Sequence, residues 1–372
     1  MITGCDTIVA LEPENLFYMT GFWGEAIGIL EKNGKTTIIA PELEIGRAKE
    51  EGIDCKVIQS DRGMSSLVTL KRFLKGKVCT DCQNYSVMQS LKKLFPKIKN
   101  SIEPFNKSRE IKDEDEITIM KKACQISAEA HVEAMKFVKP GMTEQEMEAF
   151  YQYEFSKRGG RFSAYTPIVA GGENACVLHY VENSKPLIDG ELLLVDAGCE
   201  FELYASDITR TFPINGKFTA PQLAIYEVVL EAQVKSIEAI STNNNVMDAQ
   251  IISEKVITQG LIDLGILQGS MEELHAAGAF KDFYMHKIGH WLGIDVHDAG
   301  DYMEDGDFMK FKPGMVTTVE PGIYISSSSN VDDKWKGIGI RIEDDILVTD
   351  DGNENLTAFV PSNPQEIEAL MA

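Results

Sequence analysis

The sequence predicts a two-domain protein that mixes helices and strands, in which a small α/β domain precedes a larger α+β domain. The chain has 372 residues, which is more than one hydrophobic core usually supports. Short apolar runs alternate with helical stretches up to about residue 105, and longer helices with paired strand-like runs follow. With 44% hydrophobic and 25% charged residues, the composition is that of a globular protein with a large core.

The first domain is predicted from short apolar runs typical of strands, and from one stretch, residues 65–74, with the spacing of a helix. The strand-like runs are residues 7–11, 36–41, 55–60 and 77–81. Asn33-Gly34 lies between two apolar runs and predicts a two-residue hairpin turn, in which both residues adopt positive φ. The Gly-Lys-Thr that begins at Gly34 is not a phosphate-binding loop, because Ile29 stands where that motif requires glycine.

The second domain begins after a change in composition, from short apolar runs to a polar segment. Residues 106–116 are nearly all polar and open a long helix that stops at Pro140-Gly141. Its buried face is predicted from apolar residues at three- and four-residue spacing: Ile117, Met120, Cys124, Ala128, Val132 and Met135. We therefore place the boundary near residues 106–112, which divides the chain into residues 1–109 and 110–372.

Two further helices are predicted from capping boxes. Thr143 with Glu146 opens a helix that ends at Gly159-Gly160, and Thr219 with Gln222 opens one that reaches about Ser241. The runs between and after them alternate as strands and should pair mostly antiparallel. These runs are residues 166–172, 191–198, 205–212, 314–325 and 339–349.

Charge and cysteine content exclude several classes of protein. With 36 basic and 58 acidic residues the net charge is −22, which disfavours nucleic acid and membrane surfaces as partners. The chain has no apolar run long enough to span a bilayer and no signal-peptide pattern, so we expect a cytoplasmic protein. The 7 cysteines predict no disulfide framework, and Cys79 and Cys82 lack the second pair that a zinc site requires.

Four carboxylates lie in apolar strand-like runs, where solvated acids are not expected. Asp196 ends one run and Asp207 follows eleven residues later. If the chain reverses at Phe201-Glu202, these two aspartates face each other, with no basic residue before Arg210 to neutralise them. Glu320 and Glu343 are embedded in the same way further along the chain. A bound metal explains such an arrangement.

Histidines strengthen the prediction of a metal site. His286, His290 and His297 fall within twelve positions in a glycine-containing segment, and His179 follows another such stretch. Four carboxylates and two divalent cations would balance in charge and leave room for a bridging hydroxide, which would attack a carbonyl group. Oxygen ligands with one imidazole favour Mn²⁺, Fe²⁺ or Co²⁺ over a structural zinc site.

At these residues the chain resembles the metallopeptidase family that includes aminopeptidase P, prolidase, methionine aminopeptidase and creatinase. The resemblance extends from about residue 110 to 370. It is carried by the sequences HYVEN, VDAGCEFELYASDITRTF, FYMHKIGHWLGIDVHDAGDY, TVEPGIYI and GIRIEDDILVT. The amino-terminal NLFYMTGF, residues 15–22, resembles the family's creatinase-type domain less closely.

This resemblance implies a pita-bread fold and a set of metal ligands. By family match Asp196 holds one ion, Asp207 and Glu343 bridge two, and His290 and Glu320 complete the second. Glu320 would also act as general base and then acid. The resemblance implies two divalent ions, with Mn²⁺ favoured and Co²⁺, Fe²⁺ or Zn²⁺ as alternatives.

The resemblance also implies roles for residues around the metal site. His179, His286 and His297 would line the substrate, polarise the scissile carbonyl and stabilise the tetrahedral intermediate. Arg341 would orient the site, and Tyr324 would form an aromatic wall for a proline ring. Family members usually have glycine at the position of Lys287, so we predict that this lysine either narrows the cleft or pairs with a substrate carboxylate.

The function that follows is a metal-dependent aminopeptidase that cleaves the amino-terminal Xaa-Pro bond of peptides, as a homodimer or homotetramer. An alternative is a prolidase, which cleaves Xaa-Pro dipeptides, because the short first domain resembles that of microbial prolidases. A second alternative is a catalytically inactive binding protein with the same fold. The presence of all five family ligands disfavours the inactive protein.

Overall fold

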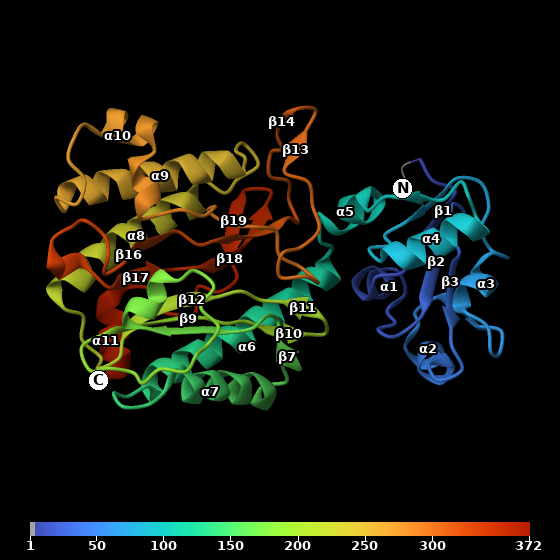
Figure 1. Cartoon of the computed structure of the whole chain (residues 1–372), viewed down its shortest axis with the longest axis horizontal. Helices are drawn as coiled ribbons and strands as arrows, with labels where there is room; N and C mark the ends of the chain where they lie inside the picture. Colours follow the sequence, from blue (N-terminus) through green and yellow to red (C-terminus); the bar gives the residue numbers. More distant parts are fainter. Residues whose placement is uncertain (1–3) are drawn as a thin grey trace. The chain divides into compact units, whose positions relative to one another are not determined.

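The computed structural model describes residues 4–372, which form two compact units that divide after Ser108 (Figure 1). The first unit is a mixed α/β domain, as the sequence predicts. Its sheet has six strands in the order β4-β3-β2-β1-β5-β6. The strands are β1 (Thr7–Ala10), β2 (Ile27–Glu31), β3 (Thr36–Ala40), β4 (Cys55–Gln59), β5 (Val78–Thr80) and β6 (Lys99–Asn100). The helices are α1 (Pro13–Thr20), α2 (Ile45–Glu51), α3 (Ser66–Leu70), α4 (Tyr85–Leu94) and α5 (Glu103–Arg109).

The hairpin between β2 and β3 forms as predicted, but its turn differs. Glu31 N–H donates to the Lys35 carbonyl, which leaves three residues in the loop. Only Gly34 has positive φ, at 85°. The prediction of a two-residue turn with two positive φ angles is therefore wrong, because a three-residue loop places one αL residue at its end.

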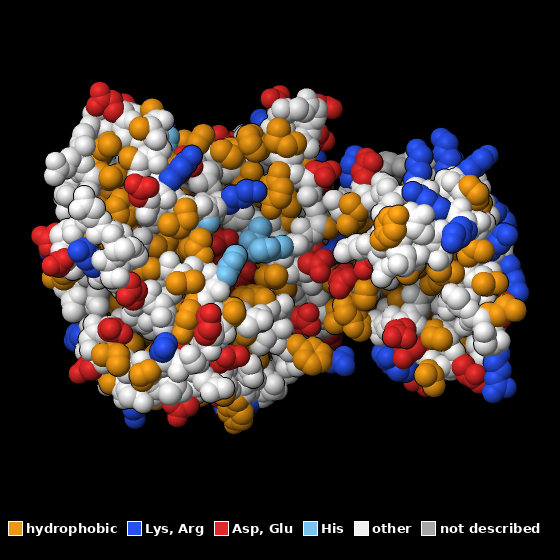
Figure 2. Space-filling model, in the orientation of Figure 1, with side chains coloured by type: hydrophobic (Ala, Val, Ile, Leu, Met, Phe, Trp, Pro, Cys, Tyr) orange, Lys and Arg blue, Asp and Glu red, His pale blue; other side chains and the backbone are white. Residues whose placement is uncertain are grey.

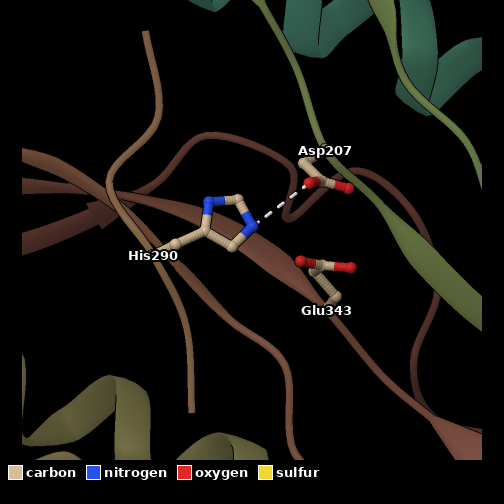
Figure 3. A group of neighbouring side chains, drawn as sticks. All are labelled: Asp207, His290 and Glu343. Atoms are coloured by element: carbon tan, nitrogen blue, oxygen red, sulfur yellow. Dashed lines mark ion pairs between the residues drawn. The ribbon is translucent and has the colours of Figure 1, made fainter. Parts of the chain in front are cut away.

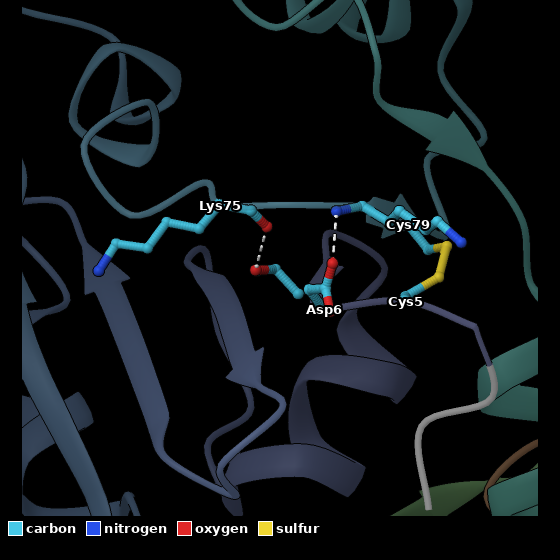
Figure 4. Close-up of a disulfide and its surroundings, with 6 residues drawn as sticks. Cys5, Asp6, Lys75 and Cys79 are labelled. Carbon is cyan, nitrogen blue, oxygen red and sulfur yellow. Dashed lines mark hydrogen bonds between the residues drawn. A yellow bond between two sulfur atoms is a disulfide. The ribbon is translucent and has the colours of Figure 1, made fainter.

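A disulfide joins Cys5 to Cys79 (Figure 4). It links the segment before β1 to β5, and these two strands are parallel neighbours in which Thr7 pairs with Val78. One bond is not a disulfide framework, but no sequence pattern predicted this pairing. Because Cys79 is bonded to Cys5, and Cys82 stays a free thiol, the C-x-x-C spacing makes neither a redox pair nor half a zinc site.

The second unit packs helices against several short antiparallel sheets. Its helices are α6 (Glu114–Phe137), α7 (Glu144–Lys157), α8 (Ala220–Glu238), α9 (Val246–Asp263), α10 (Met271–Ala277) and α11 (Pro364–Met371). Its strands are β7 (Phe162–Ser163), β8 (Ile168–Gly171), β9 (Leu192–Asp196), β10 (Cys199–Phe201), β11 (Tyr204–Ala205), β12 (Thr209–Pro213), β13 (Met303–Glu304), β14 (Asp307–Phe308), β15 (Val316–Val319), β16 (Gly322–Ile325), β17 (Ile338–Arg341), β18 (Asp344–Thr349) and β19 (Gly352–Asn355).

Most predicted helix boundaries of this unit agree with the structure, but α6 begins at Glu114, and residues 106–109 belong to the separate helix α5. Capping boxes begin α7 at Thr143 and α8 at Thr219. Helix α6 ends at Phe137, just before Pro140, and α8 ends at Glu238, three residues before the expected Ser241. Every strand pair of the unit is antiparallel. Figure 1 shows α6 and α7 along one side of β9 and β12, with α8 and α9 on the side of β16 and β17.

The hairpin that carries Asp196 and Asp207 reverses one residue later than predicted. Phe201 pairs with Tyr204, so the turn is Glu202-Leu203, both with positive φ. Thr209 rather than Asp207 therefore lies opposite Asp196. The predicted direct pairing is wrong, but the offset is two residues. Because side chains alternate along a strand, both aspartates still project from one face.

Among residues 4–372, no helix combines the length and the apolar character that crossing a membrane requires.

Candidate metal centre and active site

Ends of paired strands bring the predicted acids of the second unit together. Asp196 ends β9, Glu320 lies between β15 and β16, and Glu343 lies between β17 and β18. These strands are buried, so the acids at their ends are held inside the unit. They line a cavity of about 590 Å³. Predicted site residues in its wall are His179, Asp196, Asp207, His286, His290, His297, Glu320, Arg341 and Glu343.

Figure 2 shows histidine side chains gathered around a hollow of this face, with acidic atoms at its floor. The acids and one imidazole form a cluster suited to metal binding. Ligand atoms of Asp207, His290 and Glu343 all lie within 4.8 Å of one another (Figure 3). His290 Nε2 lies 3.5 Å from Asp207 Oδ2 and 3.7 Å from Glu320 Oε1. The structure thus brings together four of the five predicted ligands, which are His290 and the acids Asp207, Glu320 and Glu343.

His290 is oriented to present Nε2 to this cluster. Its Nδ1 lies 3.0 Å from the Trp291 carbonyl, which can only accept a hydrogen bond. Nδ1 therefore carries the proton, and Nε2 faces the carboxylates. This is the arrangement in which a backbone carbonyl fixes the tautomer of a metal-binding histidine.

The fifth predicted ligand, Asp196, is joined to the cluster by two side chains. Arg341 Nη2 donates to Asp196 Oδ2 at 2.6 Å. The Tyr165 hydroxyl lies 2.6 Å from Asp196 Oδ1 and 2.5 Å from Asp207 Oδ1, so it bridges the two aspartates. Sequence reasoning did not identify Tyr165, because a single tyrosine before the strand-like run carries no motif of its own.

The buried carboxylates of the cluster carry more negative charge than the neighbouring basic side chains neutralise. Burial, followed by the charges of Asp207 and Glu320, raises the pKa of Glu343 well above its usual range. Burial also raises the pKa of Glu320 to about 7. Burial alone would lower the pKa of His290, but Asp207 and Glu320 raise it to about 9. Oxygen-rich donors with an excess of buried negative charge fit divalent cations.

Hydrogen bonds from behind hold the acids in place. Thr209 Oγ1 donates to Glu343 Oε2 at 2.6 Å, and Arg341 Nε donates to the same Thr209 oxygen at 3.1 Å. The Asp207 backbone N–H donates to Asp345 Oδ2 at 3.0 Å. Thr209 and Asp345 were not predicted, because their roles depend on which strands become neighbours.

Arg210 does not neutralise the two aspartates. Its buried guanidinium donates to Asp344 Oδ1 at 2.7 Å and to the Glu343 carbonyl at 2.6 Å. It also donates to carbonyls of the carboxy-terminal segment at Val360 and Pro361. Arg210 therefore fixes the backbone of Glu343, and its charge is satisfied within the strand junction.

The four predicted histidines line the cavity in different ways. His286 has both ring nitrogens engaged: Nδ1 faces the Lys287 carbonyl at 2.9 Å, and Nε2 lies 2.8 Å from the Tyr324 hydroxyl. His290 and His297 have ring centroids 4.1 Å apart. Within residues 4–372, His179 and His297 make no side-chain hydrogen bond, so their ring nitrogens are the ones free to meet a ligand.

Tyr324 does not form the expected aromatic wall. Its ring is 2% exposed and does not line the cavity. Arg341 Nη1 donates to the Tyr324 hydroxyl at 3.1 Å, and the hydroxyl in turn faces His286. The prediction of a proline-binding wall at Tyr324 differs from the structure, because β16 turns this side chain inward and makes it a link between Arg341 and His286.

Ion pairs anchor the loop that carries His297. Lys112 Nζ lies 2.9 Å from Asp298 Oδ2, and the Arg109 guanidinium contacts the same carboxylate. The two basic side chains and Asp298 are almost completely buried. Removal of one partner from such a buried ion pair strongly destabilises a protein. These contacts therefore hold the loop in one position.

One histidine outside the cavity predicts a pH dependence of stability. His131 Nε2 lies 2.9 Å from the Ala197 carbonyl, and Nδ1 lies 3.0 Å from the Tyr151 hydroxyl. Burial lowers the pKa of His131 to about 4. Because the unfolded chain binds this proton at about pH 6.5, the free energy of unfolding should fall as the pH drops from about 6.5 to 4, by about 1.4 kcal/mol per unit.

Urea unfolding of wild type and His131→Gln between pH 4.5 and 8 measures this effect. The Gln amide can still donate to the Ala197 carbonyl, and it does not titrate. We expect a flatter pH profile for the variant. Profiles of equal slope would contradict the assignment of this term to His131.

A cluster of buried acids with one histidine lies at the ends of antiparallel strands under flanking helices, and this donor set is suited to divalent metal ions. Comparison with protein families matches residues 118–350 to "Metallopeptidase family M24" and residues 3–111 to "Creatinase/Prolidase N-terminal domain". The chain belongs to metallopeptidase family M24, and its pita-bread domain follows a creatinase-type domain in the sequence. This family uses divalent metal ions.

The chain is similar to enzymes named Xaa-Pro aminopeptidase. It is 51% identical to that of Haemophilus influenzae over 71% of this chain and 61% of the relative. It is 48% identical to that of Escherichia coli over 71% of this chain and 59% of the relative. The aligned region thus spans about 60% of the length of these curated relatives.

Solved structures extend the likeness over nearly the whole chain. Pseudomonas aeruginosa aminopeptidase PepP superposes with a TM-score of 0.91 at 36% identity, over 99% of this chain and 94% of that one. An E. coli aminopeptidase P variant in complex with substrate gives 0.88 at 35% identity, over 98% and 94% of the chains.

Proposed function

We propose that this protein is a metal-dependent Xaa-Pro aminopeptidase, which hydrolyses the first peptide bond of chains with proline at the second position. The observation that carries this proposal is the buried cluster of Asp207, His290 and Glu343, with Asp196 and Glu320 adjoining it. The similarity to named Xaa-Pro aminopeptidases supports the choice of substrate.

In this proposal Asp196, Asp207, His290, Glu320 and Glu343 hold two divalent ions, with Mn²⁺ preferred because oxygen donors dominate the set. Bound ions would polarise the scissile carbonyl and lower the pKa of the attacking water. Co²⁺, Fe²⁺ and Zn²⁺ are the alternative ions for the same ligands. Cytoplasmic location and assembly as a homodimer or homotetramer are further parts of the proposal.

The side chains around the ions would share the remaining steps. Glu320 would accept the proton of the attacking water and return it to the leaving proline nitrogen, a transfer that requires a carboxylate within hydrogen-bond reach of that water. His179 and His297, with unengaged ring nitrogens, donate to the carbonyl oxygen as it gains negative charge. The substrate amine lies beside Asp196. Arg341 and Tyr324 keep Asp196 and His286 in position through their hydrogen bonds.

Prolidase activity is the alternative, because both activities use the same ligands. The cavity of about 590 Å³ exceeds the needs of a dipeptide, which favours the aminopeptidase. With added Mn²⁺ we expect hydrolysis of Ala-Pro-Leu at least about tenfold faster, in kcat/KM, than of Ala-Pro. Ala-Ala-Leu serves as the control for proline and should be cleaved far more slowly. A preference for Ala-Pro would identify a prolidase instead, and no cleavage with any metal would support the inactive binding protein.

A further inference from the structure

A second cavity of about 590 Å³ adjoins the catalytic one and takes no part in the chemistry described above. It lies between α9 and the segment from Phe280 to Gly289. The two cavities share His286, Lys287, Gly289 and Tyr302 in their walls. Because these residues border both, the cavities meet there. The remaining wall is mainly apolar, and its apolar side chains include Val246, Met247, Phe280, Met285, Ile288 and Phe308.

The shared wall does not include Asp196. Tyr165, Thr166, Ile168 and Asp196 line only the catalytic cavity. A peptide whose amine lies near Asp196 can extend its later residues along the catalytic cavity to the shared wall. Figure 2 shows hydrophobic atoms bordering the histidine-lined hollow on the side of the β13–β14 hairpin.

Lys287 provides positive charge at the junction of the two cavities. Its ammonium group lies over the Tyr302 ring, 5.6 Å from the centroid. The Tyr302 ring in turn stacks on the Trp291 ring, with centroids 5.2 Å apart, and the Tyr302 hydroxyl accepts from the Trp291 backbone N–H. Within residues 4–372, no carboxylate lies within ion-pair distance of Lys287. The Lys287 ammonium is thus positioned by Tyr302 and is not neutralised by a carboxylate of the described chain.

Charges elsewhere on the second cavity are compatible with an incoming carboxylate. Glu254 is the one acid in the described wall, and it is paired with His275 Nε2 at 3.2 Å. Lys281 is a second cation in the wall, and its ammonium lies over the Phe280 ring. A free amino group would be repelled at this end, whereas a carboxylate would be attracted.

We propose that the second cavity binds the side chain of the substrate's third residue, and that Lys287 binds the carboxylate of that residue. This inference rests on the proposed function, since it places the peptide's amine at Asp196. The preferred substrates are tripeptides of the form Xaa-Pro-Zaa, in which Zaa is apolar and has a free carboxylate. A dipeptide ends within the catalytic cavity, and a longer peptide has no carboxylate at this position.

The test compares substrates that differ only at the third residue. For wild type with Mn²⁺, kcat/KM for Ala-Pro-Leu should exceed that for Ala-Pro-Gly about tenfold, because a leucine side chain is buried. It should exceed that for Ala-Pro-Leu-amide about fivefold, because the amide has no charge for Lys287. Equal kcat/KM for Ala-Pro-Leu and Ala-Pro-Gly would overturn the side-chain contact. Equal kcat/KM for Ala-Pro-Leu and Ala-Pro-Leu-amide would overturn the carboxylate contact.

Variants test the two contacts separately. Lys287→Met keeps the stem over Tyr302 and should abolish the acid-over-amide preference while leaving the leucine-over-glycine preference. Met285→Gln should reduce the leucine preference, whereas Met285→Leu should retain it. Lys255→Met removes an equivalent exposed charge from α9, away from both cavities, and should change neither preference.

Binding of the dipeptide Pro-Leu, measured by calorimetry, separates this inference from the proposed activity. Pro-Leu is an inhibitor in a solved structure of E. coli aminopeptidase P. We expect about fivefold weaker binding to Lys287→Met and unchanged binding to Lys255→Met. Failure of wild type to cleave any Xaa-Pro peptide would reject the proposed function alone, whereas equal Pro-Leu affinity in Lys287→Met and wild type would reject the role of Lys287.

Discussion

Replacing Glu320 by Gln is expected to lower kcat for Ala-Pro-Leu by about 10³-fold, because the amide cannot accept a proton from the attacking water. The same change should stabilise the metal-free chain at pH 8. Burial raises the pKa of Glu320 to about 7 in the folded state, so its ionisation opposes folding as the pH rises from about 4 to 7. Removal of that charge should raise the free energy of unfolding by about 1–3 kcal/mol.

Opposite effects on activity and stability identify a functional acid, since loss of a structural acid would lower both. Glu227→Gln, at an exposed position on α8, is the control and should change neither quantity. Steady-state kinetics and urea unfolding in the presence of a chelator supply the two measurements. A Glu320→Gln enzyme within tenfold of wild type would show that another group transfers the proton.

Removal of metal should eliminate activity and lower the melting temperature by about 10 °C. Each ion present at about 100 times its Kd adds about 2.7 kcal/mol to the stability of the folded chain. Two such ions add about 5 kcal/mol, and a domain of this size shifts its melting temperature by about 2–4 °C for each kcal/mol. The reason is the excess of negative charge in the cluster, which bound cations neutralise.

Calorimetric scans with chelator, and again after addition of Mn²⁺, measure this effect. The metal-dependent shift should shrink in Asp207→Asn, which lacks one charge of the cluster. Addition of Ca²⁺ is the control for non-specific ionic stabilisation, because calcium takes oxygen ligands, whereas one position of this cluster is an imidazole nitrogen. Full activity in the chelated enzyme would contradict a role for metal in the reaction.

The elements that position the site were predictable because local patterns determine them. Capping boxes at Thr143 and Thr219 specified the starts of two helices, and apolar runs specified the strands that end at the acids. Register was harder to predict. The turn at Glu202-Leu203 rather than Phe201-Glu202 displaced the partner of Asp196 by two residues, since the sequence does not show which residues will adopt positive φ.

Contacts between distant segments could not be predicted from the sequence. Tyr165 bridges Asp196 and Asp207 across separate strands. Tyr324 was expected at the cavity surface, yet it lies behind His286. Lys287 was recognised as unusual for the family. Its position between two cavities depends on α9, and this helix was not predicted from the sequence. Such features follow from how the strands and helices pack together.

The central claim is that the five proposed ligands, which are His290 and the four acids around it, hold two divalent ions. Elemental analysis of the purified chain, after equilibrium dialysis against Mn²⁺, tests this claim most directly. We predict about two manganese ions per chain in wild type and a lower number in Glu343→Ala, because Glu343 is the proposed bridging ligand. A chain that binds no manganese, or a Glu343→Ala variant that binds as much as wild type, would contradict the claim.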